Sequence, residues 1–156
     1  MAAWQVDFYI VPRRALFASG PLTPAALDST EWWAADAFPA DYQKRLMLVE
    51  SAAPSSSADL ETWGSADGNR VDVWSQGGRV SRVMVRVDVR RLDSKFGAAL
   101  LDFVRRAGAV LVRRDGLVVE PIISQYAGAL RNSDAWRFAN DPAEFLAKHS
   151  SDEDDE

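Results

Sequence analysis

The sequence predicts a single α+β domain, in which helices cover one face of a mainly antiparallel sheet. Several short segments alternate apolar and polar residues, which is typical of strands with one buried face. Other segments carry apolar residues at helical spacing, and glycine-containing turns separate the strand-like runs. The length of 156 residues suits one domain, and the 47% of residues that are apolar can form its core.

The N-terminal part is expected to contain one strand and two helices. Residues 4–10 alternate apolar and polar side chains and should form the strand. Thr23-Pro24 is typical of a helix start, because threonine caps helices and proline fits their first turn. Apolar residues recur at helical spacing over 40–50. Residues 51–69 are rich in serine and turn signals, so we expect a mobile loop there, with one short strand over 60–63.

The best-defined unit is a β-hairpin around Gly77-Gly78. Valines alternate with polar residues on both sides of this turn. A two-residue loop would place Val73 opposite Arg82 and would mix apolar and polar side chains on each face. A three-residue loop would pair Val71 with Val83 and keep every valine on one face. We therefore expect the three-residue loop.

The C-terminal half continues the same alternation of elements. A helix is expected over 94–107, between the N-cap Asp93 and Gly108. Two short strands, 109–112 and 117–120, flank the turn signal Asp115-Gly116. Two more helices follow, one from Pro121 to about Leu130 and one over 141–149. This order is similar in part to that of ferredoxin-like domains, a likeness of topology that implies no function.

Charge is unevenly distributed along the chain. The net charge is -5, but the last five residues are all acidic, and the 18 other acidic residues balance the 18 basic ones. We therefore divide the chain into one domain, 1–150, and an acidic tail, 151–156, which we expect to be disordered. The alternatives for the tail are that it folds back onto an arginine patch or docks on a basic partner.

Several function classes are excluded by composition. The chain has no cysteine and only one histidine, His149, which excludes disulfides, thiolate chemistry and metal sites built from histidine clusters. Motifs of serine hydrolases and of phosphate-binding loops are absent. We therefore expect no catalytic residues, no metal and no cofactor, and we favour a protein that is not an enzyme. Without a secretory signal or a membrane-spanning segment, we expect a cytoplasmic location.

The reverse face of the predicted sheet carries the candidate site. If the valines pack against helices, arginines and aromatic side chains emerge together on the other face. Aromatic and arginine side chains are enriched at protein interfaces. The candidate binding residues on this face, together with one aromatic residue from the 51–69 loop, are Tyr9, Trp74, Arg82, Met84, Arg86, Arg90 and Trp63. The alternative is a solvated face, on which Asp72 and Asp88 neutralise the arginines.

These observations favour a small cytosolic protein-binding module, such as an inhibitor, an adaptor or an immunity-type protein. The face is similar to the stacking platform of RNA-recognition domains, but Arg82, Met84 and Arg86 occupy the central strand where stacking aromatics belong. The domain also lacks the net positive charge that favours nucleic acid, so we expect neither nucleic acid nor a membrane as partner.

The alternative function is a small-molecule-binding domain or a carboxylate-dependent enzyme, with a pocket near the segment Trp32–Phe38. A deep pocket that buries Asp7 or Asp72 away from arginine would favour this alternative, because burial raises the pKa of a carboxyl group. A flat aromatic face would favour the protein-binding module. The sequence leaves open the partner, any catalysis and the oligomeric state.

Overall fold

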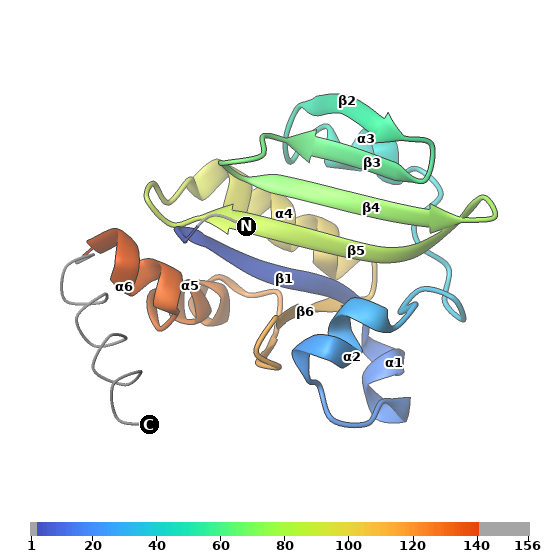
Figure 1. Ribbon diagram of the computed structural model, residues 1–156, viewed down its shortest axis with the longest axis horizontal. Helices are drawn as coiled ribbons and strands as arrows, with labels where there is room; N and C mark the ends of the chain where they lie inside the picture. Colours follow the sequence, from blue (N-terminus) through green and yellow to red (C-terminus); the bar gives the residue numbers. More distant parts are fainter. Residues whose placement is uncertain (1–2, 141–156) are drawn as a thin grey trace, which may run out of the picture.

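The computed structural model describes residues 3–140, and the predicted helix over 141–149 and the tail 151–156 lie outside them. A seven-stranded sheet with the order β2-β3-β4-β5-β1-β6-β7 forms the centre, and all neighbouring strands are antiparallel (Figure 1). The strands are β1 (Gln5–Pro12), β2 (Ala52–Ser57), β3 (Leu60–Gly64), β4 (Arg70–Gln76), β5 (Arg79–Asp88), β6 (Ala109–Arg113) and β7 (Val118–Val119). The described helices are α1 (Arg13–Ala18), α2 (Pro24–Ser29), α3 (Tyr42–Leu46), α4 (Ser94–Arg106), α5 (Ile123–Arg131) and α6 (Asp134–Asn140). The predicted α+β fold class is confirmed.

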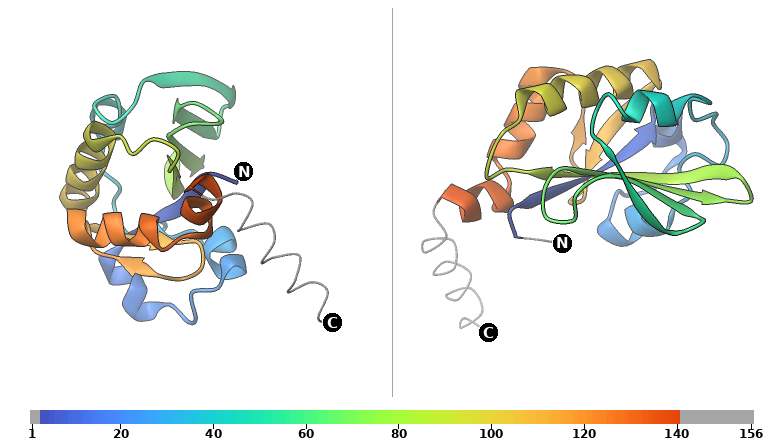
Figure 2. Two further views of the ribbon diagram at one scale, coloured as in Figure 1. Left: turned by 90° about the vertical axis from the view of Figure 1, so that its left-hand side faces the viewer. Right: turned by 90° about the horizontal axis from the view of Figure 1, so that it is seen from above.

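The helices cover the sheet unequally. α4 and α3 lie on one side of it, and the short α2 lies on the other (Figure 2). α4 begins as predicted, because the Asp93 side chain accepts hydrogen bonds from the first backbone N–H groups of the helix. Its inner stripe is buried, with Leu100 and Val104 fully so, and it shares one apolar core with the valines of β4 and β5. The face that carries these valines is therefore the covered one.

The β4–β5 hairpin keeps its valines on the helix-covered face, as predicted, but its loop differs from the prediction. Gln76 pairs with Arg79, so the turn contains only two glycines, whose φ angles of 60° and 79° lie in the left-handed region. Val71 pairs with Val85 and not with Val83. The prediction of a three-residue loop is therefore wrong.

A β-bulge at Ser81 explains how a two-residue turn preserves the faces. The register shifts by one residue beside Trp74, and Ser81 is the extra residue on β5. Below the bulge Val73 pairs with Val83, so apolar side chains meet again. The bulge is held on two sides: the Ser81 hydroxyl donates to the Trp74 carbonyl at 3.1 Å, and the Ser81 carbonyl accepts from the Trp33 N–H at 3.1 Å.

The loop predicted over 51–69 contains two strands. β3 agrees with the expected short strand, and β2 pairs with it at the edge of the sheet. The loop prediction is wrong for residues 52–57. Their sequence shows no apolar alternation, since an edge strand needs few buried side chains and can include Pro54, whose nitrogen donates no hydrogen bond.

Other boundaries differ by a few residues. α3 ends at Leu46, earlier than the helix predicted over 40–50, and α5 begins at Ile123, two residues after Pro121. α1 and α6 are not predicted by the sequence pattern, because neither carries a long apolar stripe. Among the residues that the structure describes, no helix is long and apolar enough to cross a membrane.

Candidate binding surface

Cross-strand pairing gathers the predicted polar residues on one face of the sheet. Asp7 pairs with Arg86, and Trp74 pairs with Arg82. Directly paired residues point to the same side, so these side chains are neighbours on the face opposite the valines. We call this surface the polar sheet face; it comprises Asp7, Tyr9, Arg70, Asp72, Trp74, Arg82, Met84 and Arg86. The sequence pattern predicted this grouping.

Two residues outside the sheet complete the face. Asp28 of α2 accepts a hydrogen bond from the Tyr9 hydroxyl, and its other carboxylate oxygen lies 3.0 Å from Nη2 of Arg114. Arg82 donates to the backbone carbonyl of Asp28. The hydrogen bonds from Tyr9 and Arg114 lower the pKa of Asp28, so this carboxylate is ionised. Sequence reasoning missed both Asp28 and Arg114, because nothing local marks either residue as part of a site.

Tyr9 is a supporting residue of this cluster. Tyr9 is only 1% exposed, and its hydroxyl donates a hydrogen bond to the Asp28 carboxylate. Burial, reinforced by the hydrogen bond to Asp28, raises the pKa of Tyr9 well above its usual value. The residue therefore holds the Asp28 carboxylate in place, and it presents almost no surface to a partner.

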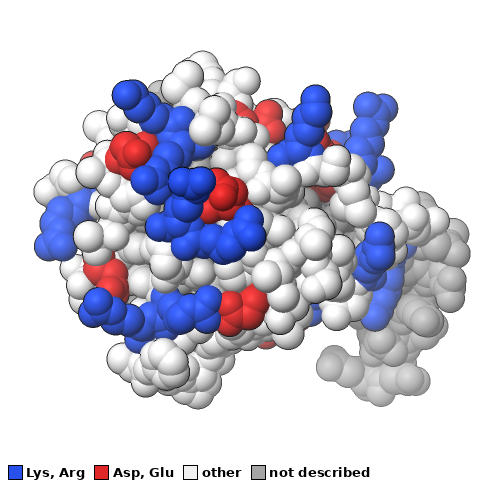
Figure 3. Space-filling view, turned by 180° about the vertical axis from the view of Figure 1, so that it is seen from behind, with Lys and Arg blue, Asp and Glu red and all other residues white. Residues whose placement is uncertain are grey.

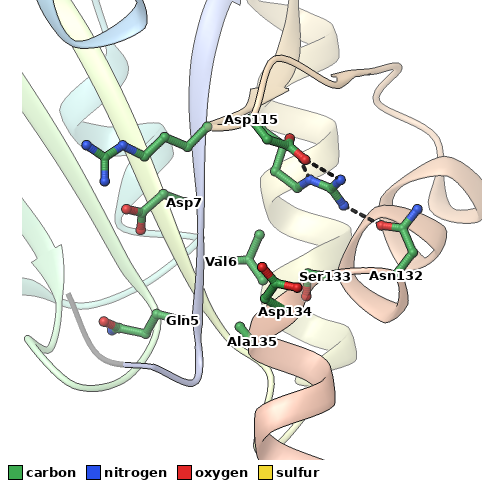
Figure 4. A pocket seen from close by; sticks show the side chains of 10 residues that line it. Gln5, Val6, Asp7, Asp115, Asn132, Ser133, Asp134 and Ala135 are labelled. Atoms are coloured by element: carbon green, nitrogen blue, oxygen red, sulfur yellow. Dashed lines mark hydrogen bonds and ion pairs between the residues drawn. The ribbon is translucent and has the colours of Figure 1, made fainter. Parts of the chain in front are cut away.

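Asp7 is the least satisfied charged group of the face. Its side chain is 4% exposed, and Oδ1 lies 3.5 Å from Nε of Arg86 without forming a hydrogen bond. Burial raises the pKa of Asp7, and this effect outweighs the opposing charges of Arg86 and Arg114. Asp7 and Gln5 point to one side of β1, whereas Val6 points to the other (Figure 4).

A pocket of about 220 Å³ adjoins Asp7, at the point where β6 ends and β1 loses a neighbouring strand. The residues that line it are Gln5, Val6, Asp7, Arg113, Arg114, Asp115, Asn132, Ser133, Asp134 and Ala135. Arg113 and Asp115 neutralise each other through two hydrogen bonds of 2.8 and 2.6 Å. Oδ1 of Asp7, by contrast, is a buried carboxylate oxygen without a hydrogen-bond partner.

Part of the face is neutralised by ion pairs. Arg70 lies 2.8 Å from the buried Asp72, which also accepts a hydrogen bond of 2.7 Å from Thr62. Arg90 lies 2.9 Å from Asp88 at the end of β5. These pairs agree with the solvated-face alternative for the two ends of the surface.

The centre of the face differs, because Arg82 forms no ion pair with a described carboxylate. Its guanidinium lies 4.7 Å from the centre of the half-buried Trp74 ring, a cation–π arrangement. The buried Nε atoms of Arg82, Arg86 and Arg114 have no hydrogen-bond acceptor. The centre of the polar sheet face therefore has unused donors and a positive balance of charge.

The structure brings together five of the predicted residues, including the buried Tyr9, which pairs with Met84, and it places Arg90 and Trp63 apart from them. Trp74, Arg82, Met84 and Arg86 are neighbours and half-buried. Tyr9 lies beneath them. Arg90 is exposed at the strand end, where it stacks over Trp4 with 4.1 Å between guanidinium and ring centre.

Trp63 does not belong to this surface, and its predicted place there is wrong. It pairs with Val71, so it points to the helix-covered face. It is 3% exposed, and its ring centre lies 6.2 Å from that of Tyr42. Once residues 60–64 form a strand, the same parity that exposes Trp74 buries Trp63.

The segment Trp32–Phe38 packs into the core. Trp33 is 2% exposed, donates to the carbonyl of Ile10 at 2.8 Å and meets Phe38 edge to face at 4.8 Å. The nearby hollow of about 350 Å³ lies on the outside and is lined by Glu31, Ala34, Gln76, Arg79, Val80 and Ser81. The aromatic side chains of this segment therefore fill space in the core and line no pocket around Asp7.

The described residues contain no candidate metal site, and the other side of the molecule also carries charged side chains. Between residues 3 and 140 no group of histidine, aspartate or glutamate side chains could hold a metal ion. On the opposite side of the molecule, where α4 lies, Lys and Arg side chains predominate, with Asp and Glu side chains among them (Figure 3). Arg82 differs from such surface charges because its side chain is half-buried and lies against the ring of Trp74.

Comparison of the chain with protein-family models, with curated proteins and with solved structures finds no match. The class that the fold and the site define is an α+β domain with an arginine-rich, partly aromatic sheet face.

Proposed function

We propose that this chain is a small protein-binding module that uses the centre of the polar sheet face to bind an acidic segment of a partner protein. The observation that carries the proposal is Arg82, which has no carboxylate partner among the described residues and lies against the half-buried ring of Trp74. A carboxylate from a partner would accept the unused hydrogen bonds of this arginine. An aromatic side chain beside an arginine is also a common anchor at protein interfaces.

The surroundings support the proposal because they hold the arginine in position before binding. Arg82 donates to the carbonyl of Asp28, and the side chain of Asp28 is itself held by Tyr9 and Arg114. An arginine held in this way loses little conformational entropy when a carboxylate binds.

The test is the affinity for a labelled oligoglutamate peptide, measured by fluorescence anisotropy. We expect wild type to bind it and binding to weaken as salt is added, because salt screens charges at the surface. We expect Arg82→Gln to weaken binding about tenfold, the cost of losing one charge-assisted hydrogen bond. Arg106→Gln is the matched control, since Arg106 lies on α4 and pairs with Asp102. Equal affinity of wild type and Arg82→Gln would reject the proposal.

The partner itself is then identified by cross-linking in an extract of the source cells. Proteins captured by wild type but not by the double variant Trp74→Ala, Arg82→Gln are the candidates. The proposal requires that each candidate carries an acidic segment, and that a synthetic peptide of this segment competes for binding.

A further inference from the structure

Another pocket, of about 220 Å³, lies between α4 and α5 on the helix-covered side of the sheet. The two helices lie side by side there (Figure 2). Unlike the pocket beside Asp7, this one is lined mainly by apolar side chains, which include Val87, Leu92, Phe96, Ile123, Ala127 and Leu130. Small-molecule sites are usually apolar pockets of this kind with a few polar groups, so the pocket is a candidate for such a site.

The open side of this pocket leaves apolar surface in contact with water. Ile123 is 63% exposed and Leu92 is 44% exposed, although both side chains line the pocket. Apolar side chains that stay exposed around a concave surface often mark a binding site. A ligand in the pocket would cover part of both side chains.

Tyr126, on α5, supplies an unpaired polar group to the pocket. The residue is only 5% exposed, yet its hydroxyl forms no hydrogen bond within the described part of the chain. The described side-chain atoms that lack both a hydrogen-bond partner and accessible surface do not include this hydroxyl, so it remains accessible from the pocket. Buried tyrosine hydroxyls usually have a partner, so this one indicates a ligand that carries a polar group.

The packing of the Tyr126 ring fixes the position of this hydroxyl. The ring centre lies 6.2 Å from that of Phe8 on β1. The ring also lies against Gly97 of α4, where an added Cβ would come within 3.1 Å of Cε1. A polar group that is already held in place loses little conformational freedom when a ligand binds.

The charges near the hydroxyl favour an uncharged ligand with a hydrogen-bond donor. Burial, together with the nearby charge of Asp93, raises the pKa of Tyr126, so the hydroxyl is protonated at neutral pH. Asp93 also lines the pocket, and its negative charge attracts a polarised hydrogen and repels a further acceptor. The exposed Arg131 at the end of α5 balances this charge, so the lining has no net charge that would select an ion.

We propose that the pocket between α4 and α5 binds a small uncharged aromatic molecule that carries one hydrogen-bond donor, such as an indole. The ring of the ligand would contact the apolar lining, and its N–H would donate to the hydroxyl oxygen of Tyr126. A cavity of about 150 Å³ holds benzene, so the larger volume here suits two fused rings. This site is independent of the polar sheet face, because Val87 at its base points to the opposite side of the sheet from Trp74 and Arg82.

The test compares three ligands of nearly equal size by titration followed with two-dimensional NMR. Indole carries an N–H donor, benzofuran carries only an acceptor, and indene carries neither. We expect all three to bind wild type at millimolar concentrations or below and to shift the resonances of α4 and α5. Failure of indole to bind, or shifts confined to other elements, would overturn the proposal.

Tyr126→Phe tests the role of the hydroxyl. We expect the ratio of indole affinity to indene affinity to fall about fivefold, the effect of losing one neutral hydrogen bond. The ratio for benzofuran and indene should change by less than about twofold, because the hydroxyl is assigned to a donor. Tyr42→Phe is the matched control, since Tyr42 lies on α3 and donates to Glu61. An unchanged indole ratio in Tyr126→Phe would exclude the hydroxyl from the site.

A second variant tests the location without altering any polar group. Ala127 lines the pocket, so Ala127→Leu should fill it and weaken the binding of all three ligands at least about tenfold. Gly128→Leu is the control on the same helix, because Gly128 is exposed and a Cβ there meets nothing within 4 Å. Near-ultraviolet circular dichroism confirms the fold of each variant. Equal indole affinity in Ala127→Leu and Gly128→Leu would contradict the proposed location.

Discussion

At the scale of single residues, the polar sheet face is a layer in which arginine side chains cover buried carboxylates. Asp72 is 2% exposed and Asp7 is 5% exposed, yet Oδ1 of Asp72 accepts hydrogen bonds of 2.7 and 2.8 Å, whereas Oδ1 of Asp7 accepts none. A carboxylate that is taken out of water without such bonds is costly in its ionised form. Asp7 therefore differs in kind from its neighbours, although the sequence presents it as one of several similar aspartates.

The pH dependence of stability should show this difference. Burial raises the pKa of Asp7 above 3.8, so the folded protein holds this proton more tightly than the unfolded chain does. The stabilising contribution of Asp7 is therefore complete below the unfolded pKa and is lost as pH rises through the folded one. We expect the free energy of unfolding of Asp7→Asn, relative to wild type, to increase between about pH 3.5 and pH 7.

Urea unfolding of both proteins at several pH values measures this trend. The attraction between Arg86 and the ionised carboxylate is already included in the folded pKa of Asp7, so it adds no separate trend. A wild type that gains stability over Asp7→Asn as pH rises would contradict the prediction.

Tyr9→Phe should destabilise the protein by about 1.5–3 kcal/mol, the usual value of a hydrogen bond to a charged group. The hydroxyl of Tyr9, on β1, donates a hydrogen bond to the Asp28 carboxylate. Equilibrium denaturation measures the loss, and a double-mutant cycle with Asp28→Asn assigns it to the pair. Strictly additive effects of the two substitutions would show that the hydroxyl and the carboxylate do not interact.

At the scale of elements, the β4–β5 hairpin determines what the polar sheet face contains. With a two-residue turn and no bulge, Val73 would pair with Arg82. Because Ser81 is left out of the pairing, Val73 pairs with Val83. A single bulged residue therefore decides whether Trp74 and Arg82 emerge on the same side, because a shift of one residue exchanges the two faces of a strand.

Deletion of Ser81 should leave the protein folded at a cost of about 1–3 kcal/mol, because Trp74 would still pair with Arg82 and Val73 with Val83, and only the two hydrogen bonds of Ser81 would be lost. Gly78→Ala is the matched control in the same hairpin. A Cβ there meets nothing within 4 Å, so it should cost only about 1–2 kcal/mol for the left-handed backbone. Thermal unfolding compares the two variants. A deletion variant without a cooperative transition would contradict the assignment of Ser81 as the unpaired residue of the bulge.

At the scale of the whole molecule, one apolar core joins the helical layer to the sheet. Phe38 illustrates the connection, since its ring centre lies 4.8 Å from that of Trp33 and 5.7 Å from that of Phe103 on α4. Elements that share one core are expected to unfold together.

Leu100→Ala should lower the free energy of unfolding by about 2–5 kcal/mol, because it leaves a cavity in this core. Leu100 is fully buried on α4. Helix content by far-ultraviolet circular dichroism and tryptophan fluorescence should report the same lowered midpoint. Arg105→Ala on the outer side of α4 should have little effect. Separate midpoints for the two signals would show that the helical layer and the sheet unfold independently.

Local pattern accounts for much of the fold and for part of the site. Alternation identified β1, β4 and β5, and the capping residue Asp93 identified the start of α4. β2 was not predicted, because an edge strand with small side chains shows no alternation of apolar and polar residues. Trp63 was misassigned for a related reason: the face of a residue can be read only after its segment is known to be a strand.

What the sequence by itself determined is which side chains share a face, since alternation along a strand is a property of neighbouring residues. Tertiary structure alone decided that Asp28 and Arg114, separated by 86 positions, meet above Tyr9, and that the Asp7 carboxylate is buried beside a pocket. The physical reason is that burial and long-range contact depend on how separate elements pack together. No local pattern records that packing, and it is the packing that gives otherwise ordinary aspartates and arginines their different chemistry.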